Sequence, residues 1–253
     1  CWTRLAAVLF SLPSPHLGCE ESYLSIRSNK IHDGYLLLER KGILENTRGE
    51  GMNVKVIIPT CKHVDDIAVL VYQMETRWSK ELEIIYTCVQ GGSASENRNA
   101  GLQKCSEGDV VIMVDDDIDQ LPLCWDRYMW EPFQKNPDAF SMVSARLLNS
   151  DGTIQPVMGG HASRRTGYAE VNVMPSAMIS FKFTGIVFDQ AYKGSGWEDT
   201  DFCRQMKTAF PHKKFIINND IKVIHRNEMK NQGGEIWVKN REHYIKKWGS
   251  EEF

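Results

Sequence analysis

The stretch Asp109-Val-Val-Ile-Met-Val-Asp-Asp-Asp117 decides the fold class of this chain. Its apolar centre, residues 110–114, predicts a strand buried on both faces, as in the middle of a parallel sheet. Three aspartates follow this strand without a break. Ligands of open α/β sheets bind in the crevice beyond the carboxyl ends of the strands. We therefore expect the three carboxylates to face a binding crevice.

The sequence on both sides of this strand alternates between strand and helix patterns. Residues 53–58 are β-branched and apolar and end at Pro59-Thr60, which predicts a first strand and a turn. The other expected strands are 82–87, 141–148, 178–182, 215–217 and 221–224, and the expected helices are 65–78, 95–104, 198–208 and 236–248. This order predicts one doubly wound, mixed α/β sheet flanked by helices.

Length and composition favour one large domain. The chain has 253 residues, 42% of them hydrophobic, and a net charge of −3, which gives it no general attraction to nucleic acid or anionic membranes. No apolar run approaches the roughly 20 residues of a transmembrane helix. Because strand-like sequence starts after Met52, we expect one α/β domain at 52–253 and an N-terminal extension of variable structure at 1–51.

The cysteines favour a reducing compartment. There are seven of them, an odd number, and none forms a CxxC pair. These spacings argue against a zinc cluster or a dense disulfide framework. We therefore predict reduced thiols and a cytoplasmic location.

The aspartate triplet has the chemistry of a metal site. Side chains of an extended chain alternate between sides, so Asp115 and Asp117 are expected to point into the same crevice. Hard cations such as Mg²⁺ or Mn²⁺ bind carboxylate and phosphate oxygens. The alternative is a solvated acidic turn, which the preceding buried strand makes less favourable.

Six motifs in order resemble the inverting family 2 glycosyltransferases of the GT-A fold, in a rhamnosyltransferase-like arrangement from Met52 to about Arg226. They are Ile57-Ile-Pro-Thr60, Glu96-Asn-Arg-Asn-Ala-Gly-Leu102, Val114-Asp-Asp-Asp-Ile118, Leu148-Asn-Ser-Asp-Gly-Thr-Ile-Gln155 with Gly159-Gly160, Phe188-Asp189 with Glu198-Asp-Thr-Asp-Phe202, and Val223-Ile-His225. The resemblance implies a GT-A nucleotide-diphospho-sugar transferase fold and a nucleotide-sugar donor.

The same resemblance implies roles for single residues. Asp115 would contact the nucleoside, Asp117 would bind Mn²⁺ or Mg²⁺, and His225 would complete the metal site. On spacing alone, His225 is equally well a surface histidine after a short strand. The residues Pro59, Thr60 and Asp116 are expected to contact the donor, and Gly160 to contact the acceptor or the sugar.

The acidic helix start at 198–208 has two interpretations. Ser195-Gly-Trp-Glu198 has the form of a capping box, which would explain the acidity without any catalytic role. The resemblance instead implies that Asp199 is the base that takes the proton of the acceptor hydroxyl, and that Glu198 orients hydroxyl groups of acceptor or donor. Trp197, an aromatic beside carboxylates, is expected to form part of a sugar-binding surface.

Arg98 and the loop before it are candidates for contacts with the nucleotide of the donor. A guanidinium near a helix start suits a phosphate, although an ordinary exposed arginine is the alternative. The family usually carries a carboxylate after the second strand that recognises the nucleotide base. This chain has Thr87-Cys-Val-Gln-Gly-Gly-Ser93 there instead. Asp65, Asp66 or backbone groups near Thr60 could replace that carboxylate.

These observations predict a metal-dependent inverting hexosyl- or pentosyltransferase that moves a sugar from a nucleotide-diphosphate sugar to an acceptor hydroxyl. The alternatives are a nucleotidyltransferase on a related α/β sheet and a non-catalytic relative that binds carbohydrate or nucleotide. A nucleotidyltransferase should carry a glycine-rich phosphate loop after the first strand, and Pro59-Thr-Cys-Lys-His63 is not glycine-rich. The sequence does not identify the acceptor: a glycan, a lipid-linked sugar, a protein and a modified nucleobase all fit.

Overall fold

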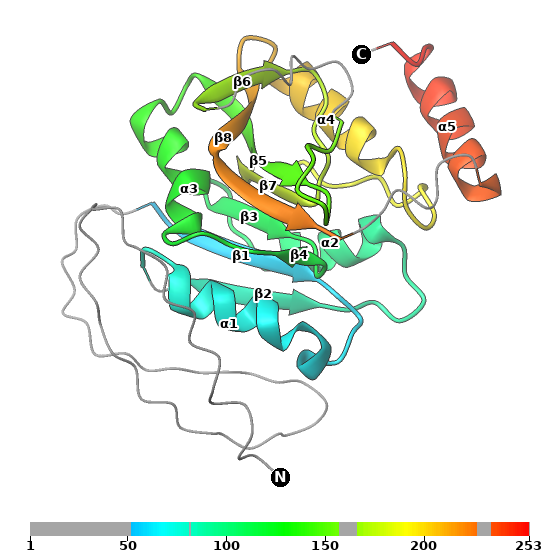
Figure 1. Ribbon diagram of the computed structural model, residues 1–253. Coiled ribbons are helices and arrows are strands. Elements are labelled where there is room, and N and C mark those ends of the chain that lie inside the picture. Colours follow the sequence, from blue (N-terminus) through cyan, green and yellow to red (C-terminus); the bar gives the residue numbers. More distant parts are fainter. Residues whose placement is uncertain (1–51, 81, 157–165, 227–233, 253) are drawn as a thin grey trace. The chain divides into compact units, whose positions relative to one another are not determined.

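A computed structural model describes residues 52–80, 82–156, 166–226 and 234–252 (Figure 1). The expected N-terminal extension at 1–51 and the expected contact residue Gly160 lie outside these described residues.

One eight-stranded mixed sheet forms the centre of the domain, with the strand order β2-β1-β3-β7-β5-β8-β4 and with β6 paired to β8. The strands are β1 (Val54–Pro59), β2 (Glu83–Thr87), β3 (Val110–Val114), β4 (Ile118–Asp119), β5 (Phe140–Leu148), β6 (Tyr168–Val171), β7 (Met178–Lys182) and β8 (Lys214–His225). The strands β2, β1 and β3 run parallel, and β7 is antiparallel to both β3 and β5. The predicted mixed α/β sheet is confirmed.

Helices cover both faces of this sheet (Figure 1). They are the 3₁₀ helix η1 (Val64–Ile67) and the α-helices α1 (Ala68–Arg77), α2 (Ala94–Leu102), α3 (Trp125–Lys135), α4 (Glu198–Ala209) and α5 (Glu235–Trp248). Buried residues of α1 and α3 share one apolar cluster with one face of the sheet. Those of α2 and α4 share a second cluster with the opposite face.

The strand β3 is the buried centre of the fold. All five of its residues are fully buried, between β1 on one side and β7 on the other. Burying a Val, Ile or Met side chain stabilises the fold by roughly 1.5–3 kcal/mol. This burial fixes the strand that carries the aspartate triplet, so the triplet is held at a defined place on the sheet edge.

Three elements were not predicted from the sequence. The helix α3 contains Pro132, which normally disfavours a helix interior, but Trp125, Met129 and Phe133 recur every four residues and are buried. The short strands β4 and β6 form through pairing with β8.

The two strands expected at 215–217 and 221–224 are instead parts of the single strand β8. Its pairing with β5 shifts register between Ala145 and Arg146, where the partners jump from Asn218 to Lys222. The polar residues at 218–220 occupy this irregularity, which explains why the sequence pattern looks interrupted there. In the described part of the chain, no helix is both long and apolar enough to span a bilayer.

Candidate active site at the carboxyl ends of the strands

The end of β3 brings two of the three aspartates together with a histidine. Candidate ligand atoms of Asp115, Asp117 and His225 all lie within 4.8 Å of one another. His225 reaches this place because it is the last residue of β8 and pairs with Ile118 of β4. The expected convergence of Asp115 and Asp117 is therefore present, and sheet pairing adds the distant histidine to the cluster.

This cluster fits a divalent cation. The Oδ1 atom of Asp117 is buried and has no hydrogen-bond partner among the described residues. Nε2 of His225 lies 3.4 Å from that oxygen. Burial raises the pKa of Asp117, but His225 and Lys62 more than offset this and lower it, so the carboxylate stays charged. Two carboxylates and an imidazole are acceptable ligands for Mn²⁺ and, with the imidazole less suited, for Mg²⁺.

Asp116, which lies between Asp115 and Asp117 in the sequence, makes a different set of contacts. Its carboxylate accepts hydrogen bonds from Thr60 Oγ1 at 2.5 Å and from Lys62 Nζ at 2.6 Å. The backbone N–H of Thr60 in turn donates to the carbonyl of Thr87 at 2.8 Å. Asp116 thus ties the end of β1 to the aspartate turn, next to Pro59.

Arg98 is buried, with 5% of its surface exposed. Its guanidinium donates to Glu198 Oε1 at 3.1 Å and to both carboxylate oxygens of Asp115 at 3.2 and 3.3 Å. Burial opposes the charge of Arg98, but Asp115 and Glu198 raise its pKa overall. The pKa of Asp115 is raised, because burial outweighs the effect of Arg98. Arg98 is therefore not an ordinary exposed arginine: Asp115 and Glu198 hold its guanidinium where it lines the pocket.

The start of α2 explains where Arg98 points. Ser93 caps this helix by accepting from Glu96 N at 3.3 Å, and Glu96 Oε2 accepts from Ser93 N at 2.7 Å. This capping box fixes the first turn of α2. Arg98, in the second turn, is buried between β3 and α4.

The predicted capping box at Ser195 and Glu198 is wrong. The N-cap of α4 is Trp197, with a φ of 73° and no side-chain cap. Gly194 and Gly196 also have positive φ, at 60° and 103°, so the chain turns sharply before the helix. A Cβ on Gly196 would lie 2.7 Å from Cδ1 of Trp237, which explains the glycine at this position.

Trp197 is not available as a sugar-binding surface. Its side chain is buried, with 7% of the residue exposed. The ring packs against Trp237 at 5.4 Å and Tyr244 at 5.0 Å between ring centroids, both on α5. The aromatic pattern was therefore misread, because a helix far along the chain covers this tryptophan.

The first two residues of α4 contribute the remaining acids. Glu198 Oε1 accepts from Arg98, whereas its Oε2 is buried without a hydrogen-bond partner in the described ranges. Asp199 accepts from its neighbour Thr200 through N at 2.8 Å and more weakly through Oγ1 at 3.4 Å. Burial, followed by the negative charge of Glu198, raises the pKa of Asp199 to about 7. A carboxylate of that pKa is well matched to take up a proton near neutral pH.

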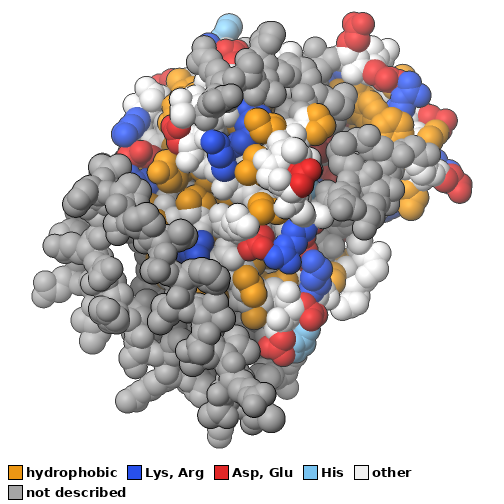
Figure 2. All heavy atoms as spheres, viewed as in Figure 1, with side chains coloured by type: hydrophobic (Ala, Val, Ile, Leu, Met, Phe, Trp, Pro, Cys, Tyr) orange, Lys and Arg blue, Asp and Glu red, His pale blue; other side chains and the backbone are white. Residues whose placement is uncertain are grey.

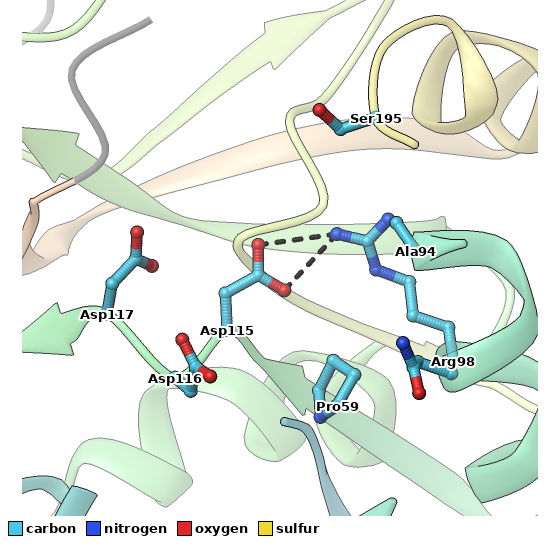
Figure 3. Close-up of a pocket in the computed structure, with 8 residues that line it drawn as sticks. Pro59, Ala94, Arg98, Asp115, Asp116, Asp117 and Ser195 are labelled. Atoms are coloured by element: carbon cyan, nitrogen blue, oxygen red, sulfur yellow. Dashed lines mark hydrogen bonds and ion pairs between the residues drawn. The ribbon is translucent and has the colours of Figure 1, made fainter. Parts of the chain in front are cut away.

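A pocket at the strand ends joins Arg98 and the three aspartates, whereas Glu198, Asp199 and His225 are not among the residues that line it (Figure 3). It is lined by Pro59, Ala94, Asn97, Arg98, Asp115, Asp116, Asp117 and Ser195. Figure 3 shows Arg98 and Asp115 joined across the pocket, with Asp117 on the far side of Asp115 and Ser195 above Arg98. On the face drawn in Figure 2, acidic and basic side chains lie next to one another near the centre.

Sequence reasoning missed the roles of Asn97 and Ser195. Asn97 lines the pocket and holds the preceding loop, since its Oδ1 accepts from Val89 N at 2.6 Å. Its place inside the Glu96–Leu102 motif was the available signal. Ser195 had been assigned to a cap and instead lines the pocket.

A disulfide lies beside the pocket, contrary to the prediction of reduced thiols. It joins Cys61 to Cys88, with their Cα atoms 4.8 Å apart. The pairing could not be predicted from cysteine spacing, because the two cysteines are 27 residues apart. Parallel pairing of Pro59 with Thr87 brings them together just past the ends of β1 and β2. The cytoplasmic expectation rested on reduced thiols and loses that support.

The sheet order, the flanking helices and the acidic strand end define a GT-A fold, and solved structures agree with this class. A crystal structure of GalNAc-T7 with UDP, GalNAc and Mn²⁺ superposes with a TM-score of 0.54 at 13% identity, covering 79% of this chain and 48% of that one. A structure of glucosyl-3-phosphoglycerate synthase from Mycobacterium tuberculosis with Mn²⁺, UDP-glucose and glycerol 3-phosphate gives 0.53 at 11% identity, covering 80% and 82%.

These likenesses establish the fold of the chain. The chain spans about half the length of GalNAc-T7. No family model matches the sequence, and no curated protein sequence matches it either.

Proposed function

We propose that this chain is a metal-dependent inverting glycosyltransferase that moves a hexose or pentose from a nucleotide-diphosphate sugar to an acceptor hydroxyl. The observation that carries the proposal is the convergence of Asp115, Asp117 and His225, with one buried carboxylate oxygen of Asp117 left without a hydrogen-bond partner among the described residues. The GT-A structures that resemble this chain were solved with Mn²⁺ and UDP or UDP-glucose, which supports the same activity.

The residues divide the chemistry between two groups of side chains. Asp115, Asp117 and His225 would hold Mn²⁺ or Mg²⁺, which neutralises charge on the departing diphosphate. Arg98 fixes Asp115 and Glu198 in place, so the two acidic groups keep their positions without a ligand. Asp199 takes the proton of the attacking hydroxyl, and the buried Glu198, held by Arg98, is the acid beside it that orients hydroxyl groups.

The proposal is tested by nucleotide release from a panel of sugar nucleotides, with and without Mn²⁺. Asp117→Asn should abolish metal-dependent binding of a nucleoside diphosphate in calorimetry, since it removes one charged ligand oxygen. Asp138→Asn is the matched control, because the Asp138 side chain is 97% exposed. Unchanged metal-dependent affinity in Asp117→Asn would refute the metal assignment.

We expect the protein to discriminate only weakly among donor nucleotides that differ in their base. The loop after β2 carries no carboxylate, and the disulfide holds it against the end of β1. The possible substitutes Asp65 and Asp66 are exposed on η1, and neither lines the pocket. Competition among UDP, GDP, ADP and dTDP should show less than about a tenfold preference, ~1.4 kcal/mol. A larger preference for UDP would contradict this expectation.

We further propose that residues 52–253 suffice for activity. The sheet starts at β1, whose first residue is Val54, and the described residues that line the pocket all follow Met52. A chain that begins at Met52 should unfold with the same cooperativity and retain its turnover. Loss of soluble expression or of turnover on truncation would contradict this domain boundary.

A further inference from the structure

Arg146, on β5, is a buried cation that the proposed reaction does not use. It is 1% exposed, and its Nε and Nη2 both donate to Oδ1 of Asn219, at 2.7 and 2.5 Å. Its Nη1 is buried and meets no acceptor within the described ranges. The pKa of Arg146 is lowered by burial, with no carboxylate among the causes. A buried charge without a counter-ion is costly, so its retention calls for an explanation.

The sheet register places Arg146 beside the candidate active site. Ser144 of β5 and Met113 of β3 both pair with Ile179 of β7, so they are level with each other across the sheet. Arg146 and Asp115 each lie two residues further towards the carboxyl ends of these parallel strands. They are therefore level too, two strand spacings apart, which is roughly 9–10 Å between backbones.

Arg146 also lies on the face of the sheet that α2 and α4 cover. Its neighbours Ala145 and Leu147 belong to the apolar cluster on the opposite face, under α1 and α3. Because strand residues alternate between faces, Arg146 is on the side of Met142, which packs in the cluster with α2 and α4. This is the face from which Glu198 and Asp199 approach the strand ends.

A second cation lies next to Arg146. Lys222 of β8 is its registered cross-strand partner, and Lys222 is exposed. Ile221 and Val223 pack in the cluster under α1 and α3, so Lys222 is on the same face as Arg146. Like charges at paired positions of neighbouring strands are destabilising. An anion between them would remove the repulsion.

The nearby acids are engaged elsewhere. Asp220 accepts from the backbone N–H of Gly167 at 2.9 Å. Glu170 pairs with Lys214 at 2.8 Å, near the other end of β8. Across the described residues, no salt bridge joins a carboxylate to Arg146 or Lys222.

We propose that Arg146 and Lys222 bind an anionic group, a phosphate or a carboxylate, carried by the acceptor. This inference rests on the proposed transferase function, because it assigns the acceptor to that site. Arg146 Nη1 would donate a hydrogen bond to the anion from the buried side, and the Lys222 ammonium would contact the anion from the exposed side. The acceptor hydroxyl would then lie towards Asp199, with the anionic group held on the neighbouring strands.

The first test measures binding without any transfer reaction. Binding of inorganic phosphate to the 253-residue chain is followed by ³¹P NMR in the presence of EDTA, so that no metal contributes. Lys222→Gln should weaken saturable phosphate binding about tenfold or more, and Arg146→Gln should do the same. Lys214→Gln, a lysine on the same strand already paired with Glu170, should leave the affinity unchanged. Equal affinity in the wild type and Lys222→Gln, or no saturable binding, would overturn the proposal.

The second test distinguishes a phosphate from a carboxylate as the bound anion. It also distinguishes failure of the anion site from failure of the proposed transferase function. Titration with acetate in place of phosphate shows whether a carboxylate also binds. If transfer is observed, Lys222→Gln should raise the KM for a phosphorylated acceptor about tenfold and leave the KM for its unphosphorylated form unchanged. Phosphate binding that depends on Lys222 without any transfer would leave the anion site intact and count against the transferase function. Transfer with equal KM changes for both acceptors would count against the anion site.

Discussion

Asp199 and Asp201 lie two residues apart in the first turn of α4, and their surroundings differ completely. Asp201 is fully buried and accepts from Gln205 Nε2 at 2.7 Å, Trp248 Nε1 at 2.6 Å and Lys247 Nζ at 3.0 Å. Asp199 accepts from Thr200, and its pKa is raised to about 7. The difference comes from α5, whose side chains reach Asp201. A carboxylate saturated by the protein is structural, whereas one left without such partners is available for chemistry.

The same contrast holds for the aspartate triplet. Asp116 is saturated by Thr60 and Lys62 and joins two segments of the chain. Asp117, the next residue, keeps a buried oxygen without a hydrogen-bond partner in the described part of the chain. In both places, acids one or two residues apart that look equivalent in the sequence divide into one structural residue and one candidate functional residue.

The largest expected effect is on turnover in Asp199→Asn. The asparagine keeps the shape and the contact with Thr200 but cannot take the acceptor proton. A general base typically contributes 10²–10⁴-fold to rate, so we expect a loss of about that size. Steady-state kinetics with a donor found in the nucleotide-release screen would measure it, with donor affinity nearly unchanged in calorimetry.

The control for this variant has to be chosen from the structure. Asp201→Asn is unsuitable, because Asp201 holds α5 in place. Asp138→Asn, far more exposed, should keep wild-type turnover. If Asp199→Asn kept more than a tenth of wild-type turnover, Asp199 would not be the base. Asp199 and Asp201 would then differ in their contacts but not in a catalytic role.

The fold was predictable from the sequence because its signals are local. The buried strand at 110–114 and the helix face at Ile67, Leu70, Val71 and Met74 depend on apolar spacing, and all of these residues are buried. The aspartate cluster followed from the strand end. The roles of Trp197 and Arg98 and the Cys61–Cys88 disulfide could not be obtained in this way. Each depends on a partner far along the chain, such as Trp237, Glu198 or a paired strand.

A smaller effect is expected on stability in Asp201→Asn. The substitution removes the charge that pairs with Lys247 and one acceptor for Gln205 or Trp248. Losing charge-assisted hydrogen bonds of this kind costs roughly 1–3 kcal/mol. Urea unfolding should show the loss as a lower midpoint with the same slope. An unchanged midpoint would mean that α5 does not depend on Asp201, which would contradict its structural role.

The last expected effect is a pH-dependent gain in stability for Asp199→Asn. The pKa of Asp199 is about 7 in the folded protein, against 3.8 for an ordinary aspartate. Between these values the folded protein holds a proton that the unfolded chain has released. The stability contributed by this group is therefore present below the ordinary value and is lost as the pH rises through about 7.

The Asp199→Asn variant has no titrating group at this position, so its stability does not fall in this way as the pH rises. Its melting temperature relative to the wild type should be higher at pH 8 than at pH 5, by a few degrees, since about 1 kcal/mol shifts the melting temperature by ~2–4 °C in a domain of this size. Differential scanning calorimetry across this pH range measures the difference, with Asp138→Asn as the control. Parallel curves for Asp199→Asn and the wild type would show that Asp199 titrates like an ordinary aspartate. The distinction from Asp201 would then rest on hydrogen-bond partners alone.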